Sequence, residues 1–119
     1  MEVVIMLFNY LDYRLAALST EVDEAYFDYK LKNYILKIKS NDHIYYDKHI
    51  KINKIPEIIN ININNIYPAP NYLKNSDLYN KEKEYINLNA IWGFVYIKHK
   101  LIPLVRLELL LSEVICETH

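Results

Sequence analysis

Two histidines and two aspartates lie close together in the sequence, as Asp42-His43 and Asp47-x-His49, and these residue types could bind a metal. Imidazole nitrogens and carboxylate oxygens are ligands for zinc and other transition metals. On one strand, however, the six-residue spacing of His43 and His49 corresponds to about 20 Å, too far for two ligands of one ion. No Cys-x-x-Cys, His-x-His or His-Glu-x-x-His pattern adds ligands nearby. We therefore expect surface histidines and no metal site.

Motifs for nucleophilic catalysis and nucleotide binding are not found in the sequence. No serine or threonine lies in a Gly-x-Ser-x-Gly elbow, and Cys116 and His119 are interpreted as an incidental pair. With only one glycine, the chain has neither a Walker loop nor a Gly-x-Gly-x-x-Gly turn. The sequence thus predicts a non-enzymatic protein without a cofactor. A small metal-independent nuclease acting through Tyr, His and Lys is the remaining enzymatic hypothesis, because it leaves no spacing signature.

Charge is segregated along the chain, although the formal net charge is only −1. Residues 1–29 carry six acids against Arg14, and residues 30–54 carry seven lysines against two aspartates. Lysines neutralise phosphates and tyrosines stack on bases, so residues 30–54 have the composition of a nucleic-acid-binding patch. The simpler interpretation, which we favour, is a solvated face or a patch that pairs with the acidic segment. The patch would consist of Lys30, Lys32, Tyr34, Lys37, Lys39, Tyr45, Lys48, Lys51 and Lys54.

Twelve tyrosines are more than a core of this size needs, and several fall in or beside a proline-containing loop. Exposed tyrosine is enriched where proteins contact one another. We therefore predict an interface with another protein, or with a second copy of the chain, at Tyr67, Pro68, Pro70, Tyr72 and Tyr79.

The composition also indicates the source and the compartment. Residues with AT-rich codons (Asn, Ile, Lys, Tyr) are abundant and those with GC-rich codons are scarce, which indicates an AT-rich genome such as that of a virus, mobile element or parasite. This bias explains part of the lysine and tyrosine excess. A single cysteine excludes an intramolecular disulfide, and the apolar runs are too short or too interrupted to span a membrane. We expect an intracellular, cytoplasmic protein, in the host cytoplasm if it is viral.

The length of 119 residues predicts one domain, 1–119. Apolar residues spaced three and four apart predict an amphipathic helix within residues 10–28: Leu11, Leu15, Leu18, Val22, Ala25 and Tyr29. Alternation over residues 31–52 favours a β-hairpin with one apolar and one cationic face. A helix that extends to Lys39 is the alternative there.

Strands are also predicted at residues 59–63 and 85–98, and Gly93 would mark a bulge or a close backbone approach. A stripe that follows Pro103 (Leu104, Leu107, Leu111 and Val114) favours a helix over 103–115, although the segment also alternates as a strand would. The sequence therefore predicts an α+β fold: an antiparallel sheet of about four or five strands with an N-terminal amphipathic helix and a C-terminal helix. The predicted function is a non-enzymatic protein-interaction module, a small subunit or accessory factor of a larger assembly; an RNA- or DNA-binding module is the alternative.

Overall fold

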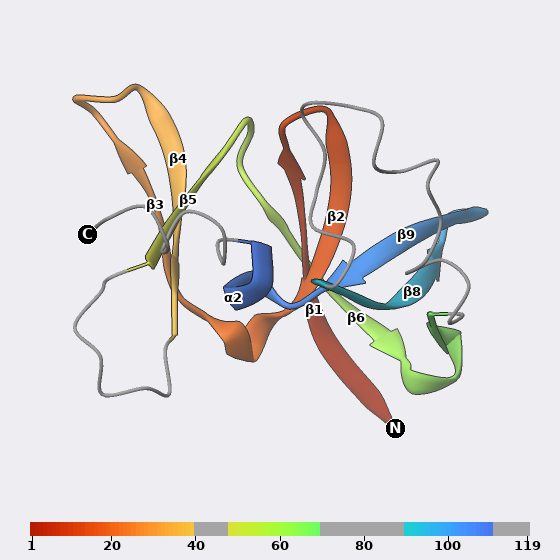
Figure 1. Ribbon diagram of the computed structural model, residues 1–119. Helices are drawn as coiled ribbons and strands as arrows, with labels where there is room; N and C mark the ends of the chain where they lie inside the picture. Colours follow the sequence, from red (N-terminus) through yellow and green to blue (C-terminus); the bar gives the residue numbers. More distant parts are fainter. Residues whose placement is uncertain (40–47, 70–89, 111–119) are drawn as a thin grey trace.

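Strands dominate the part of the chain that the computed structural model describes, residues 1–39, 48–69 and 90–110 (Figure 1). The nine strands found there are β1 (Glu2–Tyr10), β2 (Tyr13–Leu18), β3 (Val22–Asp28), β4 (Asn33–Ile38), β5 (Lys48–Ile52), β6 (Glu57–Asn62), β7 (Ile66–Pro68), β8 (Ile91–Ile97) and β9 (Lys100–Val105). Short helical segments occur at η1 (Ser19–Glu21), η2 (Ile63–Asn65) and α2 (Leu107–Leu110). The predicted α+β fold is therefore wrong, since the described chain is mostly β.

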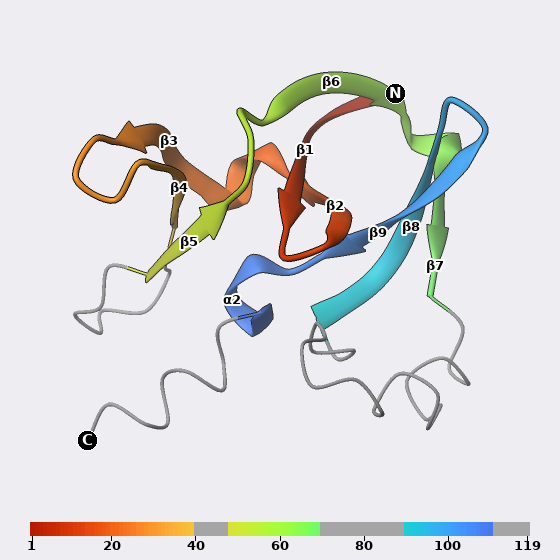
Figure 2. The same ribbon diagram turned by 90° about the horizontal axis from the view of Figure 1, so that it is seen from above.

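The strands form two sheets, one of six strands in the order β6-β1-β2-β9-β8-β7 and one of three in the order β3-β4-β5. The six-stranded sheet curls, as Figure 2 shows from above. Its edge strands β6 and β7 are joined only by the three residues of η2. A flat sheet of six strands would be about 24 Å wide, farther than so short a connection reaches. The curl therefore follows from the chain connectivity.

The predicted N-terminal amphipathic helix is wrong, because residues 10–28 hold the end of β1, then β2, η1 and β3. β2 lies between β1 and β9, and its two faces are both covered: Leu15 packs between the sheets and Ala16 inside the curl. A strand buried on both faces has no alternating pattern. The apolar residues spaced three and four apart also begin at Leu11, which lies in a turn. Its φ of 54° is in the left-handed region, so Leu11 cannot belong to a right-handed helix.

The predicted C-terminal helix over 103–115 begins later than predicted, and half of its described part, 103–110, is helical. Residues 100–105 form β9, and only Leu107–Leu110 are helical; residues 111–115 lie outside the described residues. β9 is again covered on both faces, with Leu104 inside the curl and Val105 between the sheets. Consecutive buried leucines and valines in such a strand imitate a helical stripe.

The hairpin predicted over residues 31–52 is confirmed by the antiparallel pair β4 and β5, and the alternative helix to Lys39 is wrong. Leu36 is opposite Ile50 and Lys37 is opposite His49, so the apolar and cationic faces separate as the alternation predicts. β3 extends this hairpin into the three-stranded sheet.

Two apolar cores hold the sheets, and β1 contributes to both because successive strand residues face opposite sides. Met6 and Phe8 belong to the core between the two sheets, whereas Ile5 and Leu7 belong to the core inside the curl. The outer surface of the six-stranded sheet is therefore covered where the smaller sheet packs against it.

Gly93 shows both features predicted for it, a bulge and a close approach of two backbones. The pairing of β8 with β9 shifts register between Ile91 and Gly93, and a Cβ on Gly93 would lie 2.7 Å from the carbonyl oxygen of Tyr67. The absence of a side chain therefore allows the backbone of β7 to approach β8. The strand predicted at 59–63 corresponds to β6, and β8 supplies the described part of the strand predicted at 85–98.

Candidate functional site

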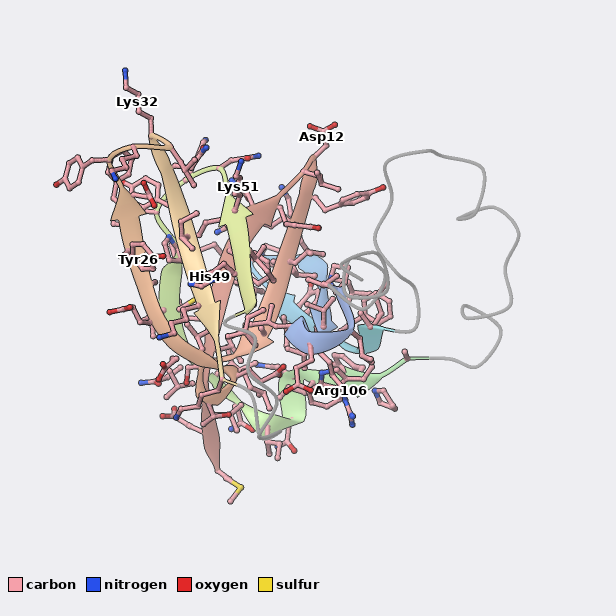
Figure 3. The ribbon with its side chains drawn as sticks, turned by 60° about the vertical axis from the view of Figure 1, so that its left-hand side comes forward. Asp12, Tyr26, Lys32, His49, Lys51 and Arg106 are labelled. Atoms are coloured by element: carbon pink, nitrogen blue, oxygen red, sulfur yellow. The ribbon has the colours of Figure 1, made fainter. Side chains whose placement is uncertain are left out.

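The outward face of the three-stranded sheet carries part of the predicted cationic patch (Figure 3). The register aligns Tyr26 with Ile35 and Lys51 across the three strands, and Glu24 with Lys37 and His49. The rings of Tyr26 and His49 meet edge to face at 6.5 Å. Lysines and an aromatic ring thus lie on one face around the buried side chain of Ile35, but the ring is that of Tyr26 and not that of the predicted Tyr34.

The other predicted patch residues are spread over the fold. Tyr34 lies on the opposite face, where it packs against the core between the sheets. Its ring centroid is 5.0 Å from that of Phe27. Lys39 lines a cleft beyond the end of β4. Lys48 is the first residue of β5. The remaining described residues are exposed in turns, at Lys30 and Lys32 between β3 and β4 and at Lys54 between β5 and β6; Tyr45 lies outside the described residues.

Acidic residues accompany the lysines on this face. The Lys37 ammonium lies 3.9 Å from the Asp23 carboxylate, and Glu24 is the cross-strand partner of Lys37. Carboxylates next to lysines reduce the attraction of the face for phosphate. The ion pair joins residue 23 to residue 37, in agreement with the interpretation that the basic segment pairs with the acidic one.

Tyr67 and Pro68, both predicted interface residues, are exposed on β7 at the edge of the six-stranded sheet. Proline is tolerated at such an edge because it has no amide hydrogen to donate. The other predicted interface residues, Pro70, Tyr72 and Tyr79, lie outside the described residues.

The pairing of β7, β8 and β9 places Tyr67 within a larger apolar surface. Tyr67 is opposite Phe94, Phe94 is opposite Pro103, and Tyr96 is opposite Leu101. Directly opposed residues share a face, and so do residues two apart on one strand. We call this surface the β7–β9 face; it consists of Tyr67, Phe94, Tyr96, Leu101 and Pro103.

Three side chains of the β7–β9 face are largely open to solvent. Tyr67 is 46% exposed, Tyr96 is 43% exposed and Leu101 is 59% exposed, while Phe94 and Pro103 are half-buried. Contiguous exposed apolar groups of this kind are characteristic of surfaces that contact another molecule. Sequence reasoning found Tyr67 but did not single out Tyr96 or Leu101, because their place beside one another depends on the pairing of β8 with β9.

A cleft of about 570 Å³ lies where the two sheets and α2 meet, lined among others by Glu21, Lys39, Trp92 and Arg106. The Glu21 carboxylate accepts a hydrogen bond of 2.9 Å from the backbone N–H of Leu107, at the start of α2. Burial raises the pKa of Glu21 above its usual 4.5, an effect that the Leu107 N–H and the Arg106 charge partly offset. This side chain therefore positions α2.

We expect Glu21→Gln and Glu21→Ala to differ in stability. Glutamine keeps an acceptor for Leu107 without the charge, so the free energy of unfolding at neutral pH should be unchanged or slightly higher. Alanine leaves the N–H of Leu107 without an acceptor, so it should lower the free energy of unfolding by about 1–3 kcal/mol.

The stability of the wild type should also depend on pH. Because the pKa of Glu21 is raised in the folded state, protonation of Glu21 stabilises the wild type fully below about pH 4.5, and this stabilisation is lost as pH rises through the folded pKa. Urea unfolding across this pH range measures both effects; equal losses in the two variants would contradict the assigned role.

Metal-ligand clusters and membrane-crossing helices are both absent from the described residues. No group of three or more His, Cys, Asp or Glu side chains within them could hold a metal ion, and His43, Cys116 and His119 lie outside them. Within the same residues, no helix has the length and apolar character needed to cross a membrane.

The chain matches no protein-family model, no curated protein and no solved structure. Functional inference therefore depends on the surfaces described above.

Proposed function

We propose that this chain is a non-enzymatic protein-interaction module that binds another protein through the β7–β9 face. The observation that carries the proposal is the exposure of Tyr67, Tyr96 and Leu101, between 43% and 59%, on one side of three paired strands. Burying such side chains in a complex removes apolar area from water, worth roughly 25 cal/mol per Å².

The chemistry of this face suits recognition. Tyrosine buries a large area while losing few side-chain rotamers, which makes it a frequent hot-spot residue. The backbone beneath Tyr96 and Leu101 is fixed by strand pairing, so binding need not order it. The Tyr96 hydroxyl is 3.4 Å from Nδ1 of His99, which supplies a polar rim.

In this proposal the chain is a small subunit or accessory factor of a larger assembly, and it acts inside the cell. The single cysteine and the absence of a membrane-spanning helix among the described residues support this location. Self-association through the same face is the related alternative, which sedimentation of the purified chain distinguishes from binding of a different protein.

The proposal is tested by affinity capture from cells of the source organism with the wild type and with Tyr96→Ala. Tyr29→Ala is the matched control, since Tyr29 is 83% exposed in the turn that follows β3. A nuclease-resistant partner that Tyr29→Ala retains and Tyr96→Ala loses supports the proposal. Equal retention by both variants contradicts it.

The outward face of the three-stranded sheet favours a second candidate, binding of single-stranded nucleic acid. Tyr26 stands in register with Lys51, and the neighbouring row holds Lys37 and His49. If this face binds RNA, Lys37→Glu with Lys51→Glu should weaken binding of a labelled single strand at least tenfold, and wild-type affinity should fall steeply with salt. Fluorescence anisotropy measures both, with Lys98→Glu as the control; salt-independent or undetectable binding rejects the candidate.

A further inference from the structure

A second cavity, of about 470 Å³, opens at one end of the curled six-stranded sheet. Its apolar wall is formed by Leu7, Ile59, Ile97 and Ile102, which continue the core inside the curl. Small-molecule sites typically enclose roughly 300–1,000 Å³ and occur at the mouths of closed or curled sheets. The cavity therefore has the size and the apolar lining of a ligand site.

The rim of this cavity is cationic. Arg14, Lys98 and Lys100 line it together with Glu57. The Arg14 guanidinium donates to Glu57 Oε1 at 2.6 Å and to Asn9 Oδ1 at 3.2 Å, so its charge is already paired. Lys98 and Lys100 have no carboxylate partner among residues 1–39, 48–69 and 90–110.

The two lysines are held at the rim by the turn between β8 and β9. Lys98 and His99 both have positive φ, 49° and 67°, which is the conformation of a two-residue hairpin turn. Lys100, the first residue of β9, is opposite Ile97 and so shares the inward face of the curl. An apolar wall below two ammonium groups that lack a carboxylate partner among the described residues is complementary to a molecule with an apolar tail and one anionic head.

We propose that this mouth binds a small amphipathic anion, a medium-chain carboxylate, with its chain against Leu7, Ile59, Ile97 and Ile102 and its head at Lys98 and Lys100. This activity is additional to protein binding, and it uses the inner side of the sheet; Leu101 at the rim is the residue that the cavity shares with the β7–β9 face. It does not depend on the proposed function.

The test uses octanoate, octanol and octylamine, which share a chain and differ in head-group charge. When octanoate is titrated into ¹³C-methyl-labelled protein, the methyl signals of Ile59, Ile97 and Ile102 should shift. The methyl signal of Ile50, in the core between the sheets, should stay unchanged. Octanoate should bind more tightly than octanol, and octylamine least tightly. Lengthening the chain to decanoate should strengthen binding by up to about fourfold per methylene.

Charge reversal at the rim separates head-group recognition from unspecific apolar binding. The double variant Lys98→Glu with Lys100→Glu should bind octanoate at least tenfold more weakly than the wild type. Lys100→Glu alone should lower the affinity by less. Lys32→Glu is the matched control, because Lys32 is exposed in a turn with a similar φ of 55°. It should change the affinity less than twofold. No shift at the mouth methyls, or octanoate affinity unchanged by the double reversal, would overturn the proposal.

Discussion

Gly93→Ala is expected to destabilise the protein by at least about 2 kcal/mol and to lower Tm by about 8 °C or more. A Cβ at this position would lie 2.7 Å from the carbonyl oxygen of Tyr67, and a backbone oxygen cannot rotate away as a side chain can. Elsewhere in a strand the same substitution stabilises by roughly 0.5–1 kcal/mol, because glycine loses more backbone entropy on folding. The expected sign is therefore opposite to that of the ordinary case. Thermal and urea unfolding measure it.

Asn60→Ala serves as the control for Gly93→Ala, since Asn60 is exposed on β6 and should shift stability by less than about 0.5 kcal/mol. Gly93→Ala should also weaken partner binding, because displacement of β7 moves Tyr67 away from Phe94. Wild-type stability in the variant would mean that β7 does not approach β8 as described.

Tyr96→Ala and Tyr67→Ala should each weaken binding of the partner about tenfold or more, the loss typical of a tyrosine hot spot. Each removes a side chain that is over 40% exposed in the free protein, so folding stability should change little while buried area in the complex is lost. Dissociation constants from interferometry with the captured partner, together with Tm values, separate the two effects.

Two comparisons test whether the loss is specific. Tyr29→Ala removes an equally large exposed ring outside the β7–β9 face and should leave the dissociation constant unchanged within twofold. Tyr67 and Tyr96 lie on different strands, so losses from both positions would indicate a shared surface. Losses at Tyr29 equal to those at Tyr96 would argue against the β7–β9 face as the binding surface.

The sequence predicted β4 and β5, which carry charged residues at the surface, and failed for β2 and β9, which are covered on both faces. β4 and β5 alternate because Lys37, His49 and Lys51 remain at the surface while Leu36 and Ile50 are buried. β2 and β9 are central in the curled sheet, so Leu15 and Ala16, or Leu104 and Val105, are buried in succession. Periodicity then no longer distinguishes a short strand from a helix.

The candidate surfaces were predictable only where they are local in sequence. Tyr67 and Pro68 were recognised from their own residue types, and the cationic face from alternation within one hairpin. The β7–β9 face joins residues 67, 94 and 103, and the cavity mouth joins residues 7, 14, 59 and 100. Such surfaces depend on strand order, which places β2 beside β9 although the two strands are far apart in the sequence.

Site-specific photocrosslinking reports directly whether the β7–β9 face contacts another protein. A photoreactive phenylalanine analogue would replace Tyr96 or Tyr67 on the β7–β9 face, and Tyr29 as the control, in cells that contain the natural partner. We expect one discrete protein adduct from positions 96 and 67 and none of this size from the control position. The purified protein alone should give this adduct only if the partner is a second copy of the chain. No adduct at 96 and 67, or the same adducts at all three positions, would contradict a docking function for this face.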